Sequence, residues 1–155
     1  MADTGIETRV PPLVVLALAA SFVWLAPEIS GGAPLEIPFG QALAAALAVA
    51  GTALAVVAVA GFRRAGTTVD PRYPDRTNQL VTGGVYRYTR NPMYVGMAML
   101  LAAFAMARAD ILGFLAVPAF VFYIDRFQIV PEERALRAHF GDAYAQWSGR
   151  VRRWL

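Results

Sequence analysis

The stretch from Phe39 to Phe62, FGQALAAALAVAGTALAVVAVAGF, decides the fold of this chain because it is apolar along its whole length and carries no charged residue. A helix needs about 20 such residues to cross the ~30 Å hydrocarbon core of a bilayer. The stretch therefore predicts one complete membrane span. Its many alanines, together with Gly40, Gly51 and Gly61, provide surfaces on which a second helix can approach closely.

The rest of the chain has the same character. Its 155 residues are 57% hydrophobic and 16% charged, with a mean hydropathy of +0.47, which exceeds what a soluble domain of this size needs. Three more apolar segments are Leu13 to Pro27, Met93 to Ala107 and Ile111 to Ile124, and we expect the last to continue as a helix into the water. We predict an all-α membrane protein with about four transmembrane helices, in one domain over residues 1–155.

The composition also excludes several classes of protein. The chain has no cysteine and a single histidine, His139, which exclude disulfides and thiolate catalysis and make a histidine-based metal centre untenable. The net charge is +3, but every basic residue is an arginine and most lie beside apolar segments rather than in basic, aromatic-rich stretches. We expect neither a metal nor a nucleic acid as partner, and the oligomeric state is open.

The placement of the arginines predicts the topology. Six lie between the second and third apolar segments and six follow the fourth, so both regions should be cytosolic. Arg108 to Asp110 is a minimal turn on the opposite side, where Asp110 can cap the next helix. For the first segment a signal peptide is the alternative, although its leader MADTGIETRVPP contains two acids and no clear cleavage site.

The segment Leu80 to Gly96, LVTGGVYRYTRNPMYVG, places polar and aromatic residues directly at the start of the third apolar segment. Asn91 can cap a helix there, and Pro92 suits the first helical position. The positive end of that helix, with Arg90 beside it, can hold a carboxylate or a phosphate. The alternative is a structural role, in which the tyrosines form an interfacial aromatic belt and the arginines meet lipid headgroups.

A second polar cluster follows the fourth segment in the stretch IVPEERALRAHFG, where Glu132 and Glu133 stand side by side. Both acids favour the positive start of a helix, and Arg137 lies four residues after Glu133, so a structural role is available. A carboxylate at this position can also bind an ammonium or ribose hydroxyls, or accept a proton. The apolar hairpin should bring this cluster and the Asn91 cluster to one membrane face.

These fragments and their order resemble the isoprenylcysteine carboxyl methyltransferase family, within the wider group that includes phospholipid methyltransferases. The resemblance rests on LVTGGVYRYTRNPMYVG, a hydrophobic hairpin, EERALRAHFG, Tyr144 and the closing Val151-Arg152-Arg153-Trp154, and it covers Gly66 to Trp154. It implies an integral membrane enzyme that uses S-adenosylmethionine at the cytosolic face. Residues 1–62 then supply N-terminal helices, and residues 63–155 supply the cofactor-binding loop, helical hairpin and C-terminal helix.

The resemblance also implies roles for individual residues. The implied cofactor-binding residues are Asn78, Gln79, Leu80, Val81, Tyr86, Asn91, Pro92, Met93, Tyr94 and Glu132. Two positions depart from the family pattern. Asn91 stands where many members have histidine, so it cannot become cationic. Gln128 stands where the prenylcysteine enzymes have a substrate-contacting arginine, and a neutral amide cannot neutralise a substrate carboxylate.

The acceptor expected is a lipophilic small molecule or a lipid that arrives from the bilayer. Arg126 and Gln128 are the predicted substrate-binding residues; Glu133, as a base, and Arg134, as an orienting cation, are the predicted catalytic residues. Two alternative functions remain open. One is a nicotinamide-dependent membrane reductase with a similar C-terminal arrangement. The other is a non-catalytic four-helix membrane protein.

Overall fold

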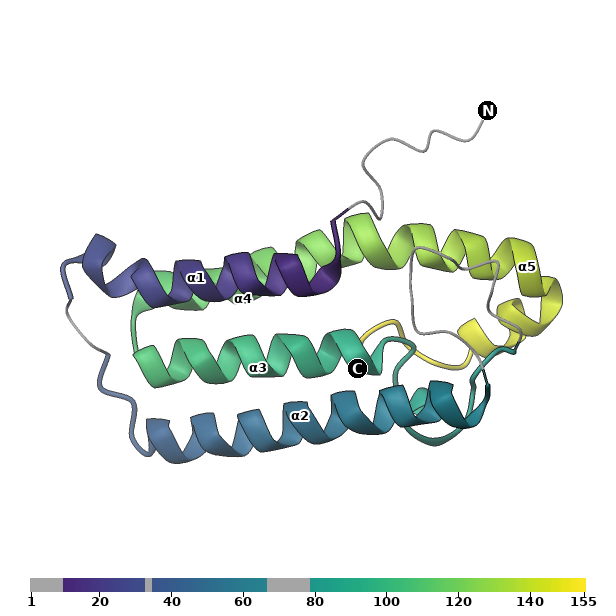
Figure 1. The fold of residues 1–155 in the computed structure, drawn as a ribbon, viewed down its shortest axis with the longest axis horizontal. Coiled ribbons are helices and arrows are strands. Elements are labelled where there is room, and N and C mark those ends of the chain that lie inside the picture. Colours follow the sequence, from purple (N-terminus) through teal and green to yellow (C-terminus); the bar gives the residue numbers. More distant parts are fainter. Residues whose placement is uncertain (1–9, 33–34, 67–78) are drawn as a thin grey trace.

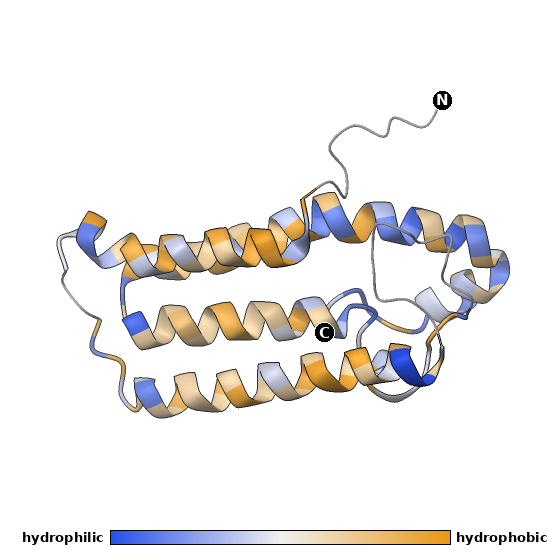
Figure 2. Cartoon of the chain, viewed as in Figure 1, coloured by the Kyte–Doolittle hydropathy of each residue, from blue (hydrophilic) through white to orange (hydrophobic). Residues whose placement is uncertain are grey.

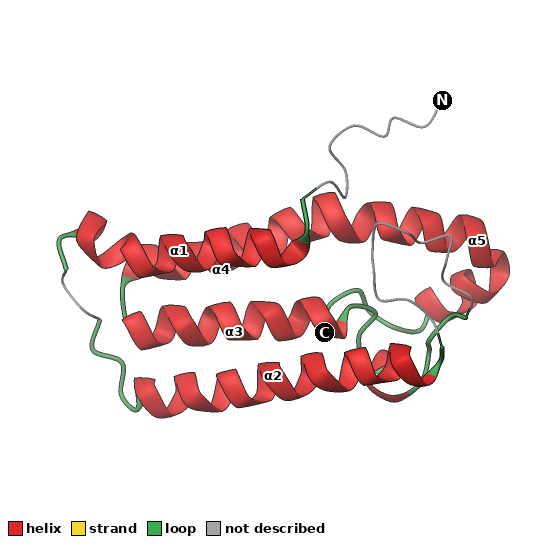
Figure 3. Cartoon of the chain, viewed as in Figure 1, coloured by secondary structure: helices red, strands yellow, loops and turns green. Residues whose placement is uncertain are grey.

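The computed structural model describes residues 10–32, 35–66 and 79–155, and the regular elements in these ranges are helices joined by short turns and loops (Figure 3). No strand occurs in these ranges. The helices are α1 (Pro12–Ser30), α2 (Gly40–Arg64), η2 (Gly84–Arg87, a 3₁₀ turn), α3 (Pro92–Arg108), α4 (Ile111–Ile124), η3 (Asp125–Ile129, a π-helical turn) and α5 (Val130–Ser148). The predicted all-α fold with about four apolar helices is confirmed.

Three of the helices have the length and hydropathy that a membrane span requires. They are α1, α2 and the helical stretch Ile111–Ser148, which is kinked at the non-helical backbone of Gly141, while α3 is apolar but has only 17 residues. At about 1.5 Å per residue, the part of this stretch before Gly141 already extends well beyond a ~30 Å hydrocarbon core. Its second half, α5, therefore lies outside the membrane, and Figure 2 shows hydrophilic residues spread along it. The chain is an integral membrane protein whose fourth apolar segment continues into water, as predicted.

The four apolar helices form a layered bundle. Figure 1 shows α1 and α4 together on one side, α2 on the other and α3 between them. Buried side chains from α1, α3 and α4 form one core cluster, which includes Val23, Leu101 and Phe120. Large apolar side chains such as Leu18, at 65% exposed, face outward, as expected where lipid replaces water.

Gly51 of α2 and Gly96 of α3 lie in very close contact. A Cβ atom placed on Gly96 would lie 2.7 Å from the carbonyl oxygen of Gly51, and one placed on Gly51 would lie 2.9 Å from the carbonyl oxygen of Gly96. The two backbones therefore touch, as small residues allow in membrane helices. The prediction of close packing on the small-residue surface of α2 is confirmed. This contact fixes α3 against α2 two residues after Tyr94.

The turn between α3 and α4 is as short as the sequence indicates. Asp110 caps α4 by accepting hydrogen bonds from the amides of Leu112, at 2.9 Å, and Gly113, at 3.2 Å. The Ser30 hydroxyl also donates to Asp110, and these hydrogen bonds hold the pKa of its carboxyl below the usual value. The same contact anchors the last turn of α1, which ends at Ser30 rather than at the predicted Pro27.

The passage from α4 to α5 is a π-helical turn rather than a break. Pro131 follows this turn and has no N–H to offer the carbonyl of Phe127, so the regular hydrogen-bond register cannot continue there. The extra residue changes the direction of the side chains that follow. This turn sets the orientation in which Glu132 and Glu133 leave the membrane.

Candidate active site

The two polar clusters identified in the sequence meet at one end of the bundle. Tyr94, buried in the first turns of α3, donates a hydrogen bond of 2.6 Å from its hydroxyl to Oε1 of Glu132 in the first turn of α5. Among the residues that the structure describes, Tyr94 is the one hydrogen-bond donor to this carboxylate. The predicted meeting of the two clusters is confirmed.

Tyr86 closes the same region from the side of α2. It lies in η2, is only 3% exposed, and packs edge-on against Phe62 with ring centroids 5.3 Å apart. A Cβ on Gly61 would lie 3.5 Å from the Tyr86 ring, an ordinary contact distance, so the ring packs directly on this turn of α2. Burial, with a further contribution from the Glu132 carboxylate, raises the pKa of the Tyr86 phenol, which therefore stays protonated. The end of α2, η2 and the start of α5 are thus neighbours.

Glu133 is held between two arginines. Its Oε1 accepts from Nη2 of Arg90 at 2.8 Å, and its Oε2 accepts from Nη2 of Arg153 at 2.6 Å. Arg153 also reaches Asp125 at 3.1 Å. Glu133 therefore pairs with these two arginines rather than with Arg137, four residues along the helix. Glu132 and Glu133 are adjacent in sequence but occupy different surroundings.

The C-terminal tail, residues 149–155, binds the start of α3 through its backbone. The carbonyl of Arg152 accepts from the Arg90 amide at 2.9 Å, and the carbonyl of Arg153 accepts from Nδ2 of Asn91 at 2.9 Å. Asn91 stands at the N-cap of α3, but its side chain makes no capping hydrogen bond. The predicted capping role is wrong: the side chain binds the tail through Nδ2, and its oxygen accepts from no amide of the first turn.

Arg90, which the sequence predicted as part of a binding site for an anion, forms its hydrogen bonds with groups of the protein itself. Its Nε and Nη2 donate to Glu133, and its Nη1 donates to the carbonyls of Ser148, at 2.7 Å, and Val151, at 3.0 Å. Arg90 does bind a carboxylate beside the helix start, but that carboxylate belongs to the protein. Its role here is to fasten α5 and the tail to α3.

Glu133→Gln and Arg153→Gln should each lower the free energy of unfolding by about 2 kcal/mol. This value lies between the ~1 kcal/mol of exposed pairs and the 3–5 kcal/mol of buried ones, because the Glu133 side chain is 18% exposed and that of Arg153 34%. The double variant should lose clearly less than the sum, since both changes remove one interaction. Thermal unfolding in detergent measures this, with Arg152→Gln on the same tail as control. Additive losses would contradict the pairing.

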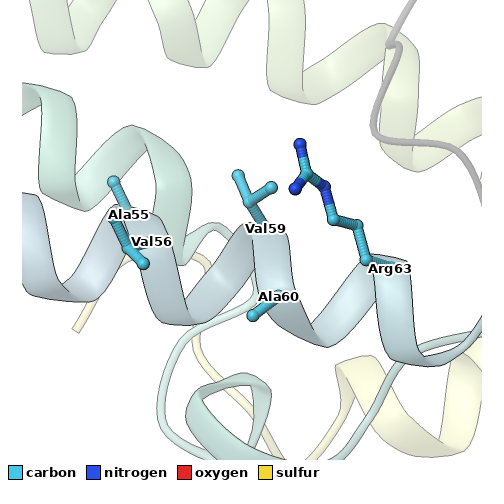
Figure 4. A pocket seen from close by; sticks show the side chains of 5 residues that line it. All are labelled: Ala55, Val56, Val59, Ala60 and Arg63. Carbon is cyan, nitrogen blue, oxygen red and sulfur yellow. The ribbon is translucent and has the colours of Figure 1, made fainter.

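One groove opens next to this region, along the last turns of α2. It has a volume of about 380 Å³ and is lined by Ala55, Val56, Val59, Ala60 and Arg63 (Figure 4). That volume lies within the ~300–1,000 Å³ typical of ligand sites. A Cβ on Gly96 would lie 3.1 Å from the Ala55 side chain, so the groove begins where α2 crosses α3.

The predicted substrate-binding residues lie in and beside η3. Gln128 is only 1% exposed; its Nε2 donates to the carbonyl of Val10 at 2.8 Å, while its Oε1 is buried without a hydrogen-bond partner in the described residues. Since a carbonyl can only accept, Val10 fixes which end of the amide is oxygen. Arg126 places its guanidinium 5.7 Å from the centroid of the Phe127 ring, and Arg134 is exposed on α5.

The other predicted cofactor residues are placed as follows. Pro92 is buried at the first position of α3, whereas Met93, Leu80 and Val81 are half-buried and Gln79 is exposed. A Cβ on Gly61 would lie 3.9 Å from Val81, which puts this residue beside Tyr86. Asn78 lies outside the described residues. The set therefore gathers around the end of α2 and the start of α3.

The sequence did not indicate the part that the tail takes in this region. Arginines and a tryptophan near a membrane are typical of interfacial residues, yet Arg153 pairs with Glu133 and the Trp154 indole donates to Asp125 at 3.1 Å. A signal was present in Asp125, an acid at the end of an apolar segment, which requires a partner. The tail therefore helps to hold α3, η3 and α5 together around the site.

Comparisons of the sequence with known proteins place this region in a family. An uncharacterized protein of Haemophilus influenzae is 38% identical over 63 residues, which make up 41% of this chain and the whole of that relative. No solved structure matches the chain. The sequence model of one family, described as phospholipid methyltransferase, matches residues 39–143, which run from the start of α2 through Tyr94, Glu132 and Glu133. The chain belongs to the phospholipid methyltransferase family.

Proposed function

We propose that this protein is an S-adenosylmethionine-dependent methyltransferase that transfers a methyl group to a lipid or lipophilic acceptor at the cytosolic face of the membrane. The observation that carries the proposal is the Tyr94–Glu132 hydrogen bond of 2.6 Å, which joins the start of α3 to the start of α5 beside the groove on α2. Membership of the phospholipid methyltransferase family supports the cofactor and the reaction.

The residues around Glu132 suit the cofactor. A carboxylate with one oxygen held by Tyr94 presents its second oxygen to an amino group, a positively charged sulfur or ribose hydroxyls, all of which S-adenosylmethionine carries. Tyr86 and Val81, which lie next to each other, offer apolar surface for a flat base. The rest of the predicted cofactor set, including Asn78, Gln79, Leu80, Asn91, Pro92 and Met93, remains part of this proposal.

When bound, S-adenosylmethionine supplies a methyl group on a positively charged sulfur. The protein then has to align the acceptor's nucleophilic atom with that methyl group and exclude water, and positioning of this kind supplies much of the acceleration in group transfer. The close contact of α2 and α3 at Gly51 and Gly96 makes this part of the frame rigid.

Gln128 favours an acceptor that donates a hydrogen bond. Its buried Oε1 lacks a partner in the described part of the chain, and an unsatisfied buried acceptor costs about 1–3 kcal/mol. An amine or hydroxyl headgroup would satisfy it, whereas a prenylcysteine carboxylate would face oxygen against oxygen. An amine-bearing lipid is therefore the acceptor that we propose, and Arg126 and Arg134 stay the residues predicted to orient its headgroup.

An ammonium acceptor must lose a proton before it can attack, and Glu133 was the base predicted from the sequence. Both of its oxygens accept from guanidinium groups, which favours a positioning role in the frame. The two roles have different kinetic consequences. Loss of a base in Glu133→Gln lowers kcat and removes that group's pKa from the pH–rate profile, whereas loss of a positioning contact lowers kcat and leaves the shape of the profile unchanged.

The orientation that we propose follows from the arginines. The loop after α2 and the region after α4 carry most of them, and both belong to the end of the bundle where Tyr94 and Glu132 meet. By the positive-inside rule this end faces the cytosol. The cofactor is then taken from the cytosol and the acceptor from the bilayer.

The decisive experiment is calorimetry of the detergent-purified protein with S-adenosylmethionine, S-adenosylhomocysteine and, in a separate titration, a reduced nicotinamide nucleotide. We expect binding of the two methionine-derived ligands and none of the nicotinamide. Transfer of radiolabelled methyl to phosphatidylethanolamine in mixed micelles, compared with a prenylcysteine, then tests the acceptor. Binding of the nicotinamide alone would support a reductase, and binding of neither would exclude the proposed reaction.

A further inference from the structure

We propose that the groove on α2 holds the acceptor lipid, with Arg63 binding its phosphate and the apolar wall from Ala55 to Val59 accommodating the upper part of an acyl chain. The groove is about 380 Å³ in volume. The inference rests on the proposed function for the identity of the acceptor. It adds a residue, Arg63, that neither the sequence motifs nor the family resemblance assigns to the site.

The walls of the groove fit a lipid better than a polar ligand. Four of the five lining residues are Ala or Val, and Arg63 is the one charged residue among them. Val56 is 61% exposed on a helix long enough to span the membrane, so the groove is open toward the lipid. A ligand that enters from the bilayer can reach it without crossing water.

The charge lies at the end of the groove where a phosphate would be. Arg63 is the second-last residue of α2, and Ala55 lies eight positions earlier, about 12 Å deeper at ~1.5 Å per residue. Figure 4 shows the side chains of Val59 and Arg63 extending from the same side of the helix. In the described part of the chain no ion pair or hydrogen bond engages Arg63, whereas Arg90 and Arg153 are paired with Glu133.

The groove is continuous with the proposed reaction site. Its deep end meets α3 where Ala55 contacts Gly96, two residues after Tyr94. Gly61, within the same stretch of α2, faces Tyr86. A lipid held in this groove therefore lies along α2 next to the start of α3, which carries Tyr94.

The test measures lipid binding by native mass spectrometry of the detergent-purified chain. The probes are dioctanoyl phosphatidylethanolamine, dioctanoyl phosphatidic acid and dioctanoylglycerol, which has no phosphate, and inorganic phosphate tests the anion alone. Arg63→Gln should weaken binding of both phosphate-bearing lipids about tenfold, as expected for loss of a charge-assisted contact, and should leave dioctanoylglycerol unchanged. Arg64→Gln, the neighbouring arginine outside the groove, should change all three less than twofold.

Two further variants test separately the contribution of the apolar groove and that of the Arg63 charge to lipid binding. Val59→Trp fills the groove and should weaken binding of all three lipids while leaving S-adenosylmethionine binding unchanged. Arg63→Lys keeps the charge and should retain most of the affinity, which covers the case in which Arg63→Gln folds poorly. Equal effects of Arg63→Gln and Arg64→Gln would overturn the proposal. So would a loss of S-adenosylmethionine binding in Arg63→Gln with unchanged lipid binding, since the arginine would then serve the cofactor.

These outcomes are distinguishable from failure of the proposed function. If the wild-type chain binds phosphate-bearing lipids through Arg63 but does not bind S-adenosylmethionine, the groove is a lipid site and the methyltransferase proposal fails. If it binds S-adenosylmethionine but shows no preference for phosphate-bearing lipids, the methyltransferase proposal stands and the groove assignment fails.

Discussion

Glu132→Gln should weaken S-adenosylmethionine binding by tenfold to 100-fold, which corresponds to the ~1.5–3 kcal/mol of a hydrogen bond to a charged group. The amide keeps the shape of the side chain, and its oxygen can still accept from Tyr94, whose hydroxyl lies 2.6 Å from Oε1. Burial raises the pKa of Glu132 to about 7, so above that pH the variant removes a negative charge and little else. Calorimetry with the detergent-purified variant measures the change.

Asp142→Asn is the matched control, because it makes the same carboxylate-to-amide change on an exposed part of α5. It should bind the cofactor as the wild type does. Tyr94→Phe should lie between the two, since it leaves the Glu132 charge in place but no longer holds it. Wild-type affinity in a folded Glu132→Gln protein would remove Glu132 from the cofactor site.

Gly96→Ala should lower the free energy of unfolding by about 3 kcal/mol, the upper part of the range for overpacked cores. The added Cβ would lie 2.7 Å from the Gly51 carbonyl oxygen and 3.1 Å from the Ala55 side chain, and a backbone atom cannot turn away as a side chain can. The helices α2 and α3 have to separate. Thermal or denaturant unfolding in detergent gives the loss.

Gly61→Ala is the control for this prediction, because its Cβ would lie 3.5 Å from the Tyr86 ring, an ordinary contact, and should cost less than ~1 kcal/mol. Gly51→Ala should resemble Gly96→Ala, and the double variant should be little worse than either single change, since one methyl group already separates the helices. Similar stabilities for Gly61→Ala and Gly96→Ala would mean that α2 and α3 do not cross at these glycines.

Much of the fold could be predicted because the length of an apolar stretch indicates directly whether it can span a membrane as a helix. The stretch from Phe39 to Phe62 exceeds what a membrane span needs, and the structure places α2 within two residues of it. Asp110 was predictable as a cap because a short acid before an apolar helix has few other roles. The end of α1 was less predictable, since the contact that extends it to Ser30 comes from Asp110, far away in the sequence.

The candidate site was predictable where side chains carry the interaction. Tyr94 and Glu132 stand in conspicuous motifs, and their hydrogen bond unites the two clusters that the sequence indicated. The contacts of the tail were not predictable in the same way. These contacts use the backbone carbonyls of Arg152 and Arg153. Because every residue has a backbone carbonyl, no pattern of residue types predicts such contacts.

The two ends of the Tyr94–Glu132 hydrogen bond belong to different membrane helices. Tyr94 lies in the first turns of α3, and Glu132 follows the π-helical turn at the end of α4. A thicker or thinner bilayer changes the tilt of each helix by an amount that depends on that helix's own apolar length and packing. The height of one group relative to the other thus depends on the surrounding lipid. The membrane is therefore more than the source of the acceptor, because its thickness helps to set the geometry in which the cofactor would be held.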